Sequence, residues 1–210
     1  MNDAKKFFTN TEKKKIEEAV QSVECNTIGE VAVMVVNSSD DYREAIVLGS
    51  VFLGSGISLL MSEAFLNASL NYFILLSFLF FLLMHVLFKA LPVMKIAFVG
   101  RHRLEEAVRE RALRAFYEKG LYKTKVNTGV LFFISLLEHK VWVLADKGIY
   151  EKIDQQTLNT YAQTVSRGVK KGHTCDALCQ AINEAGAILA KHFPITPEDS
   201  NELSDQIMTE

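Results

Sequence analysis

The chain has 210 residues, of which 49% are hydrophobic and 23% are charged, and this composition excludes a disordered or low-complexity protein. A net charge of −2 excludes a protein with an overall basic surface, so we expect no nucleic-acid partner. Three cysteines are an odd number, which excludes a small secreted domain held together by disulfides.

The start of the chain predicts a helix followed by a buried strand. Thr9 with Glu12 three residues later is a capping-box signal, and apolar residues at helical spacing follow it. After Gly29 the run EVAVMVV, residues 30–36, is continuously apolar and rich in valine. This pattern is typical of a strand buried on both faces. A polar loop from residue 37 to residue 41 ends the strand.

Two long apolar runs come next, residues 45–62 and 64–88, and Glu63 is the single charged side chain between Glu44 and Lys89. A bilayer core about 30 Å thick needs about 20 apolar helical residues, so both runs are long enough to span it. The alternative is a buried helical hairpin in a soluble core, but a domain this small cannot cover so large an apolar surface. Residues 44–89 are therefore predicted to form a transmembrane helical hairpin that contacts the lipid bilayer.

The charges that flank the hairpin predict its orientation. Lys and Arg residues precede the first run and follow the second, whereas residues 62–71 contain none. Positively charged flanks stay in the cytoplasm, so we expect a multi-pass protein with both termini cytoplasmic. Gly49, Gly54 and Gly56 in the first run predict close packing against the second. His85 is interpreted as an interfacial histidine, with a functional intramembrane role as the alternative.

Behind the hairpin the sequence predicts a helix over 101–119, ended by Gly120, and a strand hairpin made of residues 129–137 and 140–145. Helices over 158–169 and 176–192 follow, and an acidic flexible tail is expected from residue 195 to residue 210. One strand ahead of the membrane is not stable alone, so it must pair with the strands behind it. The predicted fold is a small α/β sandwich over 1–43 and 90–194, interrupted by the transmembrane hairpin at 44–89.

The order of these elements and the run NTGVLFFISLLEHKVWVLADKGI, residues 127–149, resemble the TPM domain family. This fold is shared by a plant thylakoid lumen protein, a photosystem II repair protein and a nematode receptor modulator, and bacterial membrane proteins of the family are the most similar. The resemblance implies an αβα sandwich and a bacterial cytoplasmic (inner) membrane location. It also implies a phosphatase activity and divalent-ion binding, which are described for some members. The inserted hairpin and the cytoplasmic domain depart from the common family pattern.

Asp146, Asp40 and Asp41 are the candidate ligand-binding residues. Asp146 follows a strand and matches the family's Asp-x-Gly-Ile position, and Asp40 and Asp41 follow the first strand on a segment that is able to converge with it. Carboxylates of this kind hold Mg²⁺ or Ca²⁺ through oxygen ligands. The alternative is that Asp146 orders its turn by bonding local backbone N–H groups, and that Asp40 and Asp41 are ordinary loop carboxylates. No phosphatase nucleophile motif is visible, so no catalytic residue is assigned.

Two further sets of residues, a run of arginines and a pair of cysteines with nearby histidines, each have a functional and a purely structural interpretation. The arginines at 101, 103, 109, 111 and 114 are expected to attract anionic lipid head groups, with balance by glutamates of the same helix as the alternative. His173, Cys175 and Cys179 with His192 are too few and too spread to predict a zinc site. Two functions therefore stand: binding of a membrane-protein partner in assembly or maintenance, or a divalent-metal-assisted phosphatase.

Overall fold

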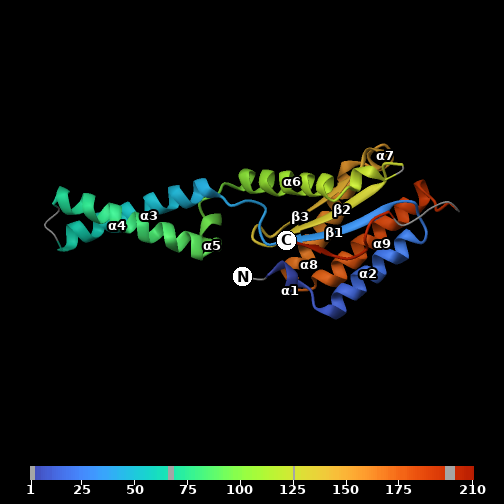
Figure 1. The fold of residues 1–210 in the computed structure, drawn as a ribbon, viewed down its shortest axis with the longest axis horizontal. Coiled ribbons are helices and arrows are strands. Elements are labelled where there is room, and N and C mark those ends of the chain that lie inside the picture. The colour runs from blue at the N-terminus through green and yellow to red at the C-terminus, as the bar shows by residue number, and fades with distance from the viewer. Residues whose placement is uncertain (1–2, 66–68, 125, 197–201) are drawn as a thin grey trace. The chain divides into compact units, whose positions relative to one another are not determined.

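The computed structural model describes residues 3–65, 69–124, 126–196 and 202–210. The chain divides into two compact units. One contains residues 40–104, and the other combines residues 1–39 with residues 105–210. We call the first the hairpin unit and the second the sheet unit, and Figure 1 shows the elements of both.

The sheet unit is built on four strands in the order β3-β2-β1-β4. Strand β1 (Glu30–Val36) pairs in parallel with β2 (Gly129–Ser135), from Glu30 opposite Gly129 to Val36 opposite Ser135. Strand β3 (Lys140–Ala145) pairs antiparallel with β2. The strand ahead of the apolar runs therefore joins one sheet with the two strands behind them, as expected, and it pairs directly with β2 but not with β3.

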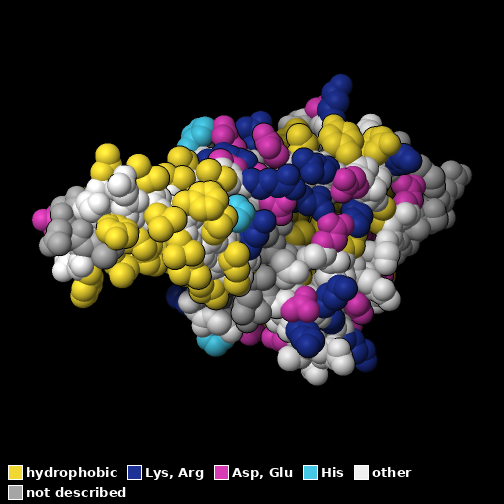
Figure 2. All heavy atoms as spheres, turned by 60° about the vertical axis from the view of Figure 1, so that its left-hand side comes forward, with side chains coloured by type: hydrophobic (Ala, Val, Ile, Leu, Met, Phe, Trp, Pro, Cys, Tyr) yellow, Lys and Arg dark blue, Asp and Glu magenta, His cyan; other side chains and the backbone are white. Residues whose placement is uncertain are grey.

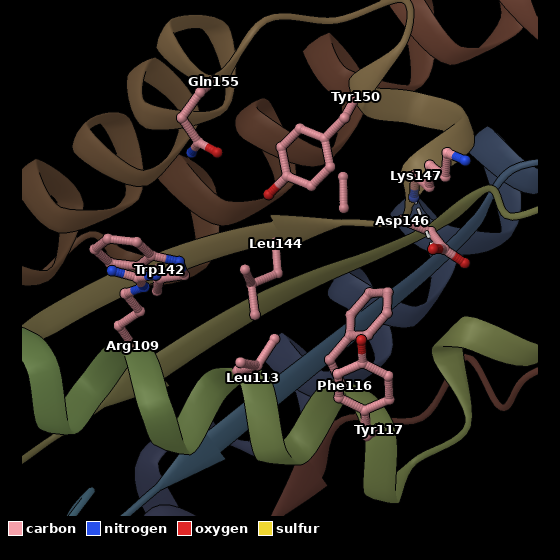
Figure 3. Close-up of a pocket in the computed structure, with 11 residues that line it drawn as sticks. Arg109, Leu113, Phe116, Tyr117, Trp142, Leu144, Asp146, Lys147, Tyr150 and Gln155 are labelled. Carbon is pink, nitrogen blue, oxygen red and sulfur yellow. Dashed lines mark hydrogen bonds between the residues drawn. The ribbon is translucent and has the colours of Figure 1, made fainter.

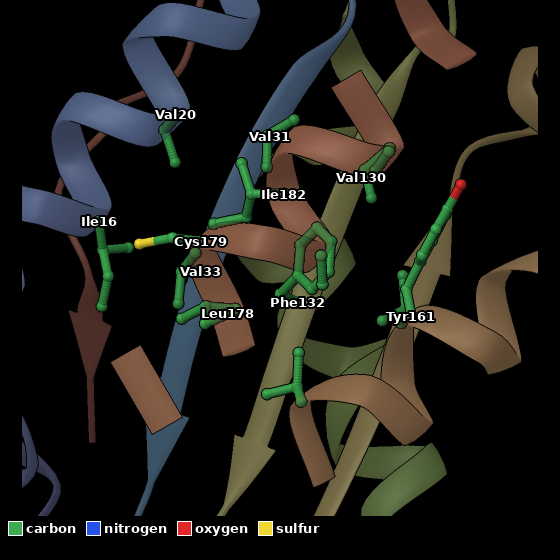
Figure 4. Packing of buried hydrophobic residues seen from close by; sticks show 14 of the residues in the cluster. Ile16, Val20, Val31, Val33, Val130, Phe132, Tyr161, Leu178, Cys179 and Ile182 are labelled. Carbon is green, nitrogen blue, oxygen red and sulfur yellow. The ribbon is translucent and has the colours of Figure 1, made fainter. Parts of the chain in front are cut away.

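Helices cover both faces of this sheet. Strand β1 alternates between them: Val31, Val33 and Val35 belong to one buried cluster, and Ala32, Met34 and Val36 belong to the other. The first cluster, part of which Figure 4 shows, includes α2 (Asn10–Glu24), α8 (Gln155–Lys171) and α9 (Thr174–His192). The second includes α6 (Arg101–Glu118). The whole of β1 is buried, as its continuous apolar run predicts.

Local sequence signals explain how several elements begin and end. The capping box of Thr9 and Glu12 is present at the start of α2, in agreement with the prediction. Gly120 and Gly172 adopt positive φ angles of 77° and 75° after α6 and α8, a conformation that glycine adopts without strain. The remaining short helices of the sheet unit are α1 (Ala4–Phe7), η1 (Leu121–Lys123) and α7 (Lys147–Tyr150).

The end of the chain differs from the expected flexible tail. Strand β4 (Met208–Thr209) pairs in parallel with β1. The backbone of Glu210 donates to the carbonyl of Val35 at 3.1 Å and accepts from the N–H of Asn37 at 2.9 Å, and its carboxylate pairs with Arg111 and Lys119. The prediction of a solvated tail is therefore wrong for these last residues. The physical reason is that β1 offers an unpaired edge, and the acidic side chain finds two cations beside it.

The hairpin unit contains α3 (Arg43–Phe65), α4 (Leu70–Ala90) and α5 (Pro92–Ile96). Small residues bring α3 and α4 together, as predicted for Gly49 and Gly54, whereas the prediction is wrong for Gly56, which has no atom within 4 Å of an added Cβ. The Ser58 hydroxyl donates to the carbonyl of Phe73 at 2.8 Å, and a Cβ atom built on Gly54 would lie 2.9 Å from the backbone nitrogen of Phe81. Both helices are long and apolar enough to cross a membrane, and only Phe88 of α4 is buried among its described residues. Figure 2 shows the hydrophobic side chains that gather over this unit.

Candidate functional site

Asp146 lies between β3 and the short helix α7, of which it is the N-cap. One carboxylate oxygen accepts a hydrogen bond from the backbone N–H of Lys147 at 2.7 Å, and the backbone N–H of Asp146 donates to Gly129 at 2.8 Å. Gly148 follows in a tight place, since an added Cβ would lie 2.7 Å from the carbonyl oxygen of Asn127. Asp146 therefore orders its own turn, which is the plain alternative that the sequence left open.

The second carboxylate oxygen of Asp146 is not explained by this turn. Oδ2 is buried and has no hydrogen-bond partner among the residues that the structure describes. A buried oxygen in this state costs free energy, typically about 1–3 kcal/mol when its partner is missing. Asp146 therefore keeps one acceptor that a ligand is able to use.

Asp40 and Asp41 belong to the hairpin unit and have partners there. Asp40 forms an ion pair with Arg103 and accepts from the backbone N–H groups of Asp41 and Tyr42. Burial acts to raise the pKa of Asp40, but these hydrogen bonds and the charge of Arg103 hold it below its ordinary value of 3.8. Asp41 pairs with Arg43 at 3.3 Å. Both carboxylates thus have partners within the hairpin unit.

The strand pairing shows at which end of the sheet β1 ends and at which end Asp146 lies. Val36, the last residue of β1, lies opposite Ser135 at the end of β2. Ala145, which precedes Asp146, lies opposite Val130 near the start of β2, because β3 is antiparallel. The end of β1 and Asp146 are therefore at opposite ends of the sheet. This order gives no support to a site shared by the three aspartates, and a ligand at each stays a prediction.

A divalent ion has no visible ligand set in the described part of the chain. No group of three or more His, Cys, Asp and Glu side chains there is placed to hold a metal. Asp146 is the one carboxylate in the lining of its pocket, where Arg109 and Lys147 are cations. A Ca²⁺ site needs six to eight oxygen ligands, so these residues do not fit one. Binding of Mg²⁺ or Ca²⁺ stays a prediction, and no chemical step is derived from it.

Asp146 lies at the edge of a cavity of about 590 Å³ within the sheet unit (Figure 3). The cavity lies between α6 on one side and β3, α7 and the start of α8 on the other. Its walls are mainly aromatic and apolar, with Arg109, Asp146, Lys147 and Gln155 as polar groups. The aromatic and aliphatic lining residues are Phe116, Tyr117, Trp142, Tyr150, Leu113 and Leu144. A cavity of this size and lining is typical of small-molecule sites.

Trp142 and Glu138 are among the buried polar groups that sequence reasoning missed. Trp142 lines the cavity, and its indole Nε1–H is buried without an acceptor among the described residues. Glu138 is 6% exposed at the other end of the sheet, where it accepts hydrogen bonds from the hydroxyl of Ser135 and the backbone N–H of Ser39. Both are polar residues next to apolar strand residues, which was the available signal.

The arginines predicted to meet lipid head groups are partly engaged within the protein. Arg103 pairs with Asp40 and Glu44, and Arg111 pairs with Glu118 and Glu210. The alternative of balance by the helix's own glutamates therefore holds for Arg111 through Glu118, whereas Arg103 pairs with residues outside the helix. Attraction of anionic lipid head groups stays a prediction. Arg109 lines the cavity instead.

The cysteine cluster has a structural role in the core. Cys175 and Cys179 are buried on α9, and their thiols approach the carbonyl oxygens of Glu12 and Lys15 at 3.8 Å. Burial raises the pKa of Cys175 to about 12, so its thiol is protonated at neutral pH. A neutral thiol is a poor metal ligand. Cys25, by contrast, is exposed.

These features define a mixed α/β domain with a four-stranded sheet and an aromatic cavity beside its antiparallel edge strand. The family model of the TPM domain matches residues 93–188, and the predicted resemblance to that family is confirmed. The chain is also similar to the BA42 protein from the psychrophilic bacterium Bizionia argentinensis, solved by NMR. That similarity has a TM-score of 0.63 at 20% identity, covers 100% of each chain and shows the fold alone. A comparison with curated proteins found no match.

Proposed function

We propose that the protein is a membrane-anchored TPM-domain protein with a binding role in the assembly or maintenance of a membrane complex. Helices α3 and α4 span the bacterial cytoplasmic (inner) membrane, and the sheet unit contacts a membrane-protein partner on the cytoplasmic side. The apolar surface of α4 is the observation that carries this proposal. Leu75, Phe78 and Val86 are each 65% exposed, and neighbouring leucines are similarly uncovered.

The dimensions of the helices support the bilayer as the environment of that surface. Helix α4 has 21 residues and α3 has 23. At a rise of about 1.5 Å per residue they are roughly 31 and 34 Å long, which matches a hydrocarbon core about 30 Å thick. The hydroxyls of Ser50 and Ser55 donate to carbonyls one turn earlier on α3, which satisfies these polar groups without water.

The charge distribution supports the proposed orientation. Arg43 begins α3, while Lys89 and Lys95 lie in the last turn of α4 and in α5. No Lys or Arg occurs in residues 62–71, between the two helices. By the positive-inside rule the open end of the hairpin, and with it both termini, lies in the cytoplasm. Arg101 and Arg114, which have no ion-pair partner in the described part of the chain, are proposed to attract anionic lipid head groups.

Cysteine labelling tests the anchor and its orientation. The native Cys25 is exposed in the sheet unit and reports on the cytoplasmic side. A Glu63→Cys variant in a Cys25→Ser background reports on the end of α3. In intact spheroplasts a membrane-impermeant maleimide is expected to label Cys25 only after the membrane is opened, and to label the Glu63→Cys variant at once. Labelling of Cys25 in intact cells, or release of the protein by alkaline carbonate, would contradict the proposal.

Purification in a mild detergent tests the binding role. We expect one membrane protein to co-purify with this chain in a fixed ratio. When the gene for that partner is deleted, the recovery of this chain from the membrane should fall. A protein that always purifies alone, and whose deletion leaves the membrane proteome unchanged, counts against an assembly role.

A metal-assisted phosphatase is the second candidate, favoured by the unpartnered Oδ2 of Asp146 at the cavity edge. Hydrolysis of a generic phosphate ester is measured with and without Mg²⁺ or Ca²⁺, for the native protein and for Asp146→Asn. Asp154→Asn is the matched control, because Asp154 also caps a helix through the N–H of Thr157. Metal-dependent turnover lost only in Asp146→Asn supports an enzyme, and absence of turnover in the native protein favours the binding role.

A further inference from the structure

We propose that the cavity between α6 and β3 binds a small aromatic anion, with its flat body against the aromatic walls and its anionic group at Arg109 and Trp142. This inference concerns the sheet unit alone. It does not depend on whether α3 and α4 span a membrane, and no metal takes part in it.

The shape and lining of the cavity indicate the body of the ligand. A volume of about 590 Å³ lies within the range of roughly 300–1,000 Å³ that is usual for small-molecule sites. Trp142 and Leu144 lie on one face of β3, and Leu113, Phe116 and Tyr117 face them from α6 (Figure 3). Leu113 is 44% exposed and Tyr117 is 56% exposed, so their apolar surface is available to a ligand. A flat aromatic molecule buries more of this surface than a compact polar one does.

The polar groups at one end of the cavity indicate an anion. Arg109 is exposed on α6 and has no ion pair among the described residues. In Figure 3 its side chain reaches toward the indole of Trp142, whose Nε1–H is buried without an acceptor. Both groups are donors, and neither is able to accept a hydrogen bond. A phosphate or carboxylate at this end would satisfy both, with small movements of Arg109 to admit it.

The opposite end of the cavity favours a donor. Trp142 lies in β3 and Asp146 directly follows it, four residues further along the chain. At roughly 3.3 Å per residue the Cα atoms of Trp142 and Asp146 are about 13 Å apart. Oδ2 of Asp146 is an acceptor without a partner in the described chain. The ligand that fits both ends is elongated, carries an anionic group at one end, and has an N–H or O–H group at the other.

Intrinsic fluorescence tests the proposal at the site itself, because Trp142 is the single tryptophan of the chain. The full chain in a neutral detergent is titrated with adenosine monophosphate and with phenyl phosphate, two aromatic anions, with excitation at the tryptophan band. Adenosine and inorganic phosphate are the controls, because adenosine lacks the anionic group of adenosine monophosphate and inorganic phosphate lacks its aromatic body. A saturable change in Trp142 emission is expected with at least one aromatic anion, at concentrations where inorganic phosphate gives none.

Two arginine variants separate this site from a general charge effect. Arg109→Gln is expected to weaken binding of the responding anion about tenfold, the size of one lost charge-assisted hydrogen bond, and to leave adenosine binding unchanged. Arg114→Gln is the matched control, since Arg114 is also exposed on α6 and does not line the cavity. No saturable response to either anion, an equal response to inorganic phosphate, or equal weakening by both variants would overturn the proposal.

Discussion

Glu24, at the end of α2, illustrates how burial changes the chemistry of a single residue. Its Oε1 accepts from the backbone N–H of Val31 at 3.0 Å, and this bond stabilises the start of β1. Burial is the main cause that raises the pKa of Glu24 to about 8, and the nearby charges of Glu30 and Asp205 add to it against the opposing hydrogen bond. Glu24 is therefore largely protonated in the folded protein at neutral pH.

This raised pKa predicts a pH-dependent stability. Between about pH 4.5, the ordinary pKa, and about pH 8, the folded protein holds a proton that the unfolded chain has lost, so stability falls as the pH rises through this window. Glu24→Gln is expected to remove this part of the pH dependence and to be more stable than the native protein at pH 8. Urea midpoints at pH 5.5, 7 and 8 measure the effect. Glu18→Gln, an exposed change on the same helix, should follow the native protein, whereas parallel curves for native and Glu24→Gln would contradict the interpretation.

Residue roles were predictable where they depend on near neighbours in the chain. The capping box of Thr9 and Glu12 and the turn ordered by Asp146 involve residues at most three positions apart, so the sequence indicated them. The roles of Glu138 and Trp142 were not predicted. Each depends on burial, and burial is decided by segments distant in the sequence that pack around the side chain.

At the scale of elements, Gly54 predicts how tightly α3 and α4 pack. An alanine there places Cβ 2.9 Å from the backbone of Phe81, so the helices must separate, and overpacking of this kind costs about 1–3 kcal/mol. Gly56→Ala is the control, because no atom lies within 4 Å of its added Cβ and both changes gain similar helix propensity.

Disulfide formation measures this packing directly. The hydroxyls of Ser58 and Ser77 are 3.1 Å apart, so cysteines at both positions, in a Cys25→Ser background, are expected to cross-link on oxidation. Gly54→Ala should slow the cross-linking severalfold, and Gly56→Ala should leave it unchanged. Equal rates in the two variants would show that Gly54 is not a close contact between the helices.

Elements with a strong pattern were predicted well, and short ones were not. The seven apolar residues of β1 and the helical spacing in α9 identify each element by themselves. Strand β4 has two residues in an acidic segment, and its pairing with Met34 and Val35 joins positions more than 170 residues apart. No local pattern distinguishes such a strand from a tail, because only the open edge of β1 makes it one.

The division of the molecule into two units predicts two separate unfolding events in detergent. Urea is expected to unfold the sheet unit, which red-shifts the emission of Trp142. The 23 residues of α3 and the 21 residues of α4 should stay helical in the micelle, because their backbone groups have no better partner there. Fluorescence and far-UV circular dichroism measure the two events. Complete loss of helicity together with the fluorescence transition would contradict an apolar environment for the hairpin.

The sequence by itself determined three features of the protein. These are two long apolar helices, strands made of continuous apolar runs, and the TPM-domain resemblance that is confirmed over residues 93–188. These features depend on local periodicity and composition, which the sequence shows directly. The tertiary structure decided the strand order, which puts Asp146 and the end of β1 at opposite ends of the sheet, and it brought Arg109 of α6 to Trp142 of β3. The reason is physical: contacts between distant segments depend on how complementary faces pack, and a local pattern shows that a face is apolar without showing which partner covers it.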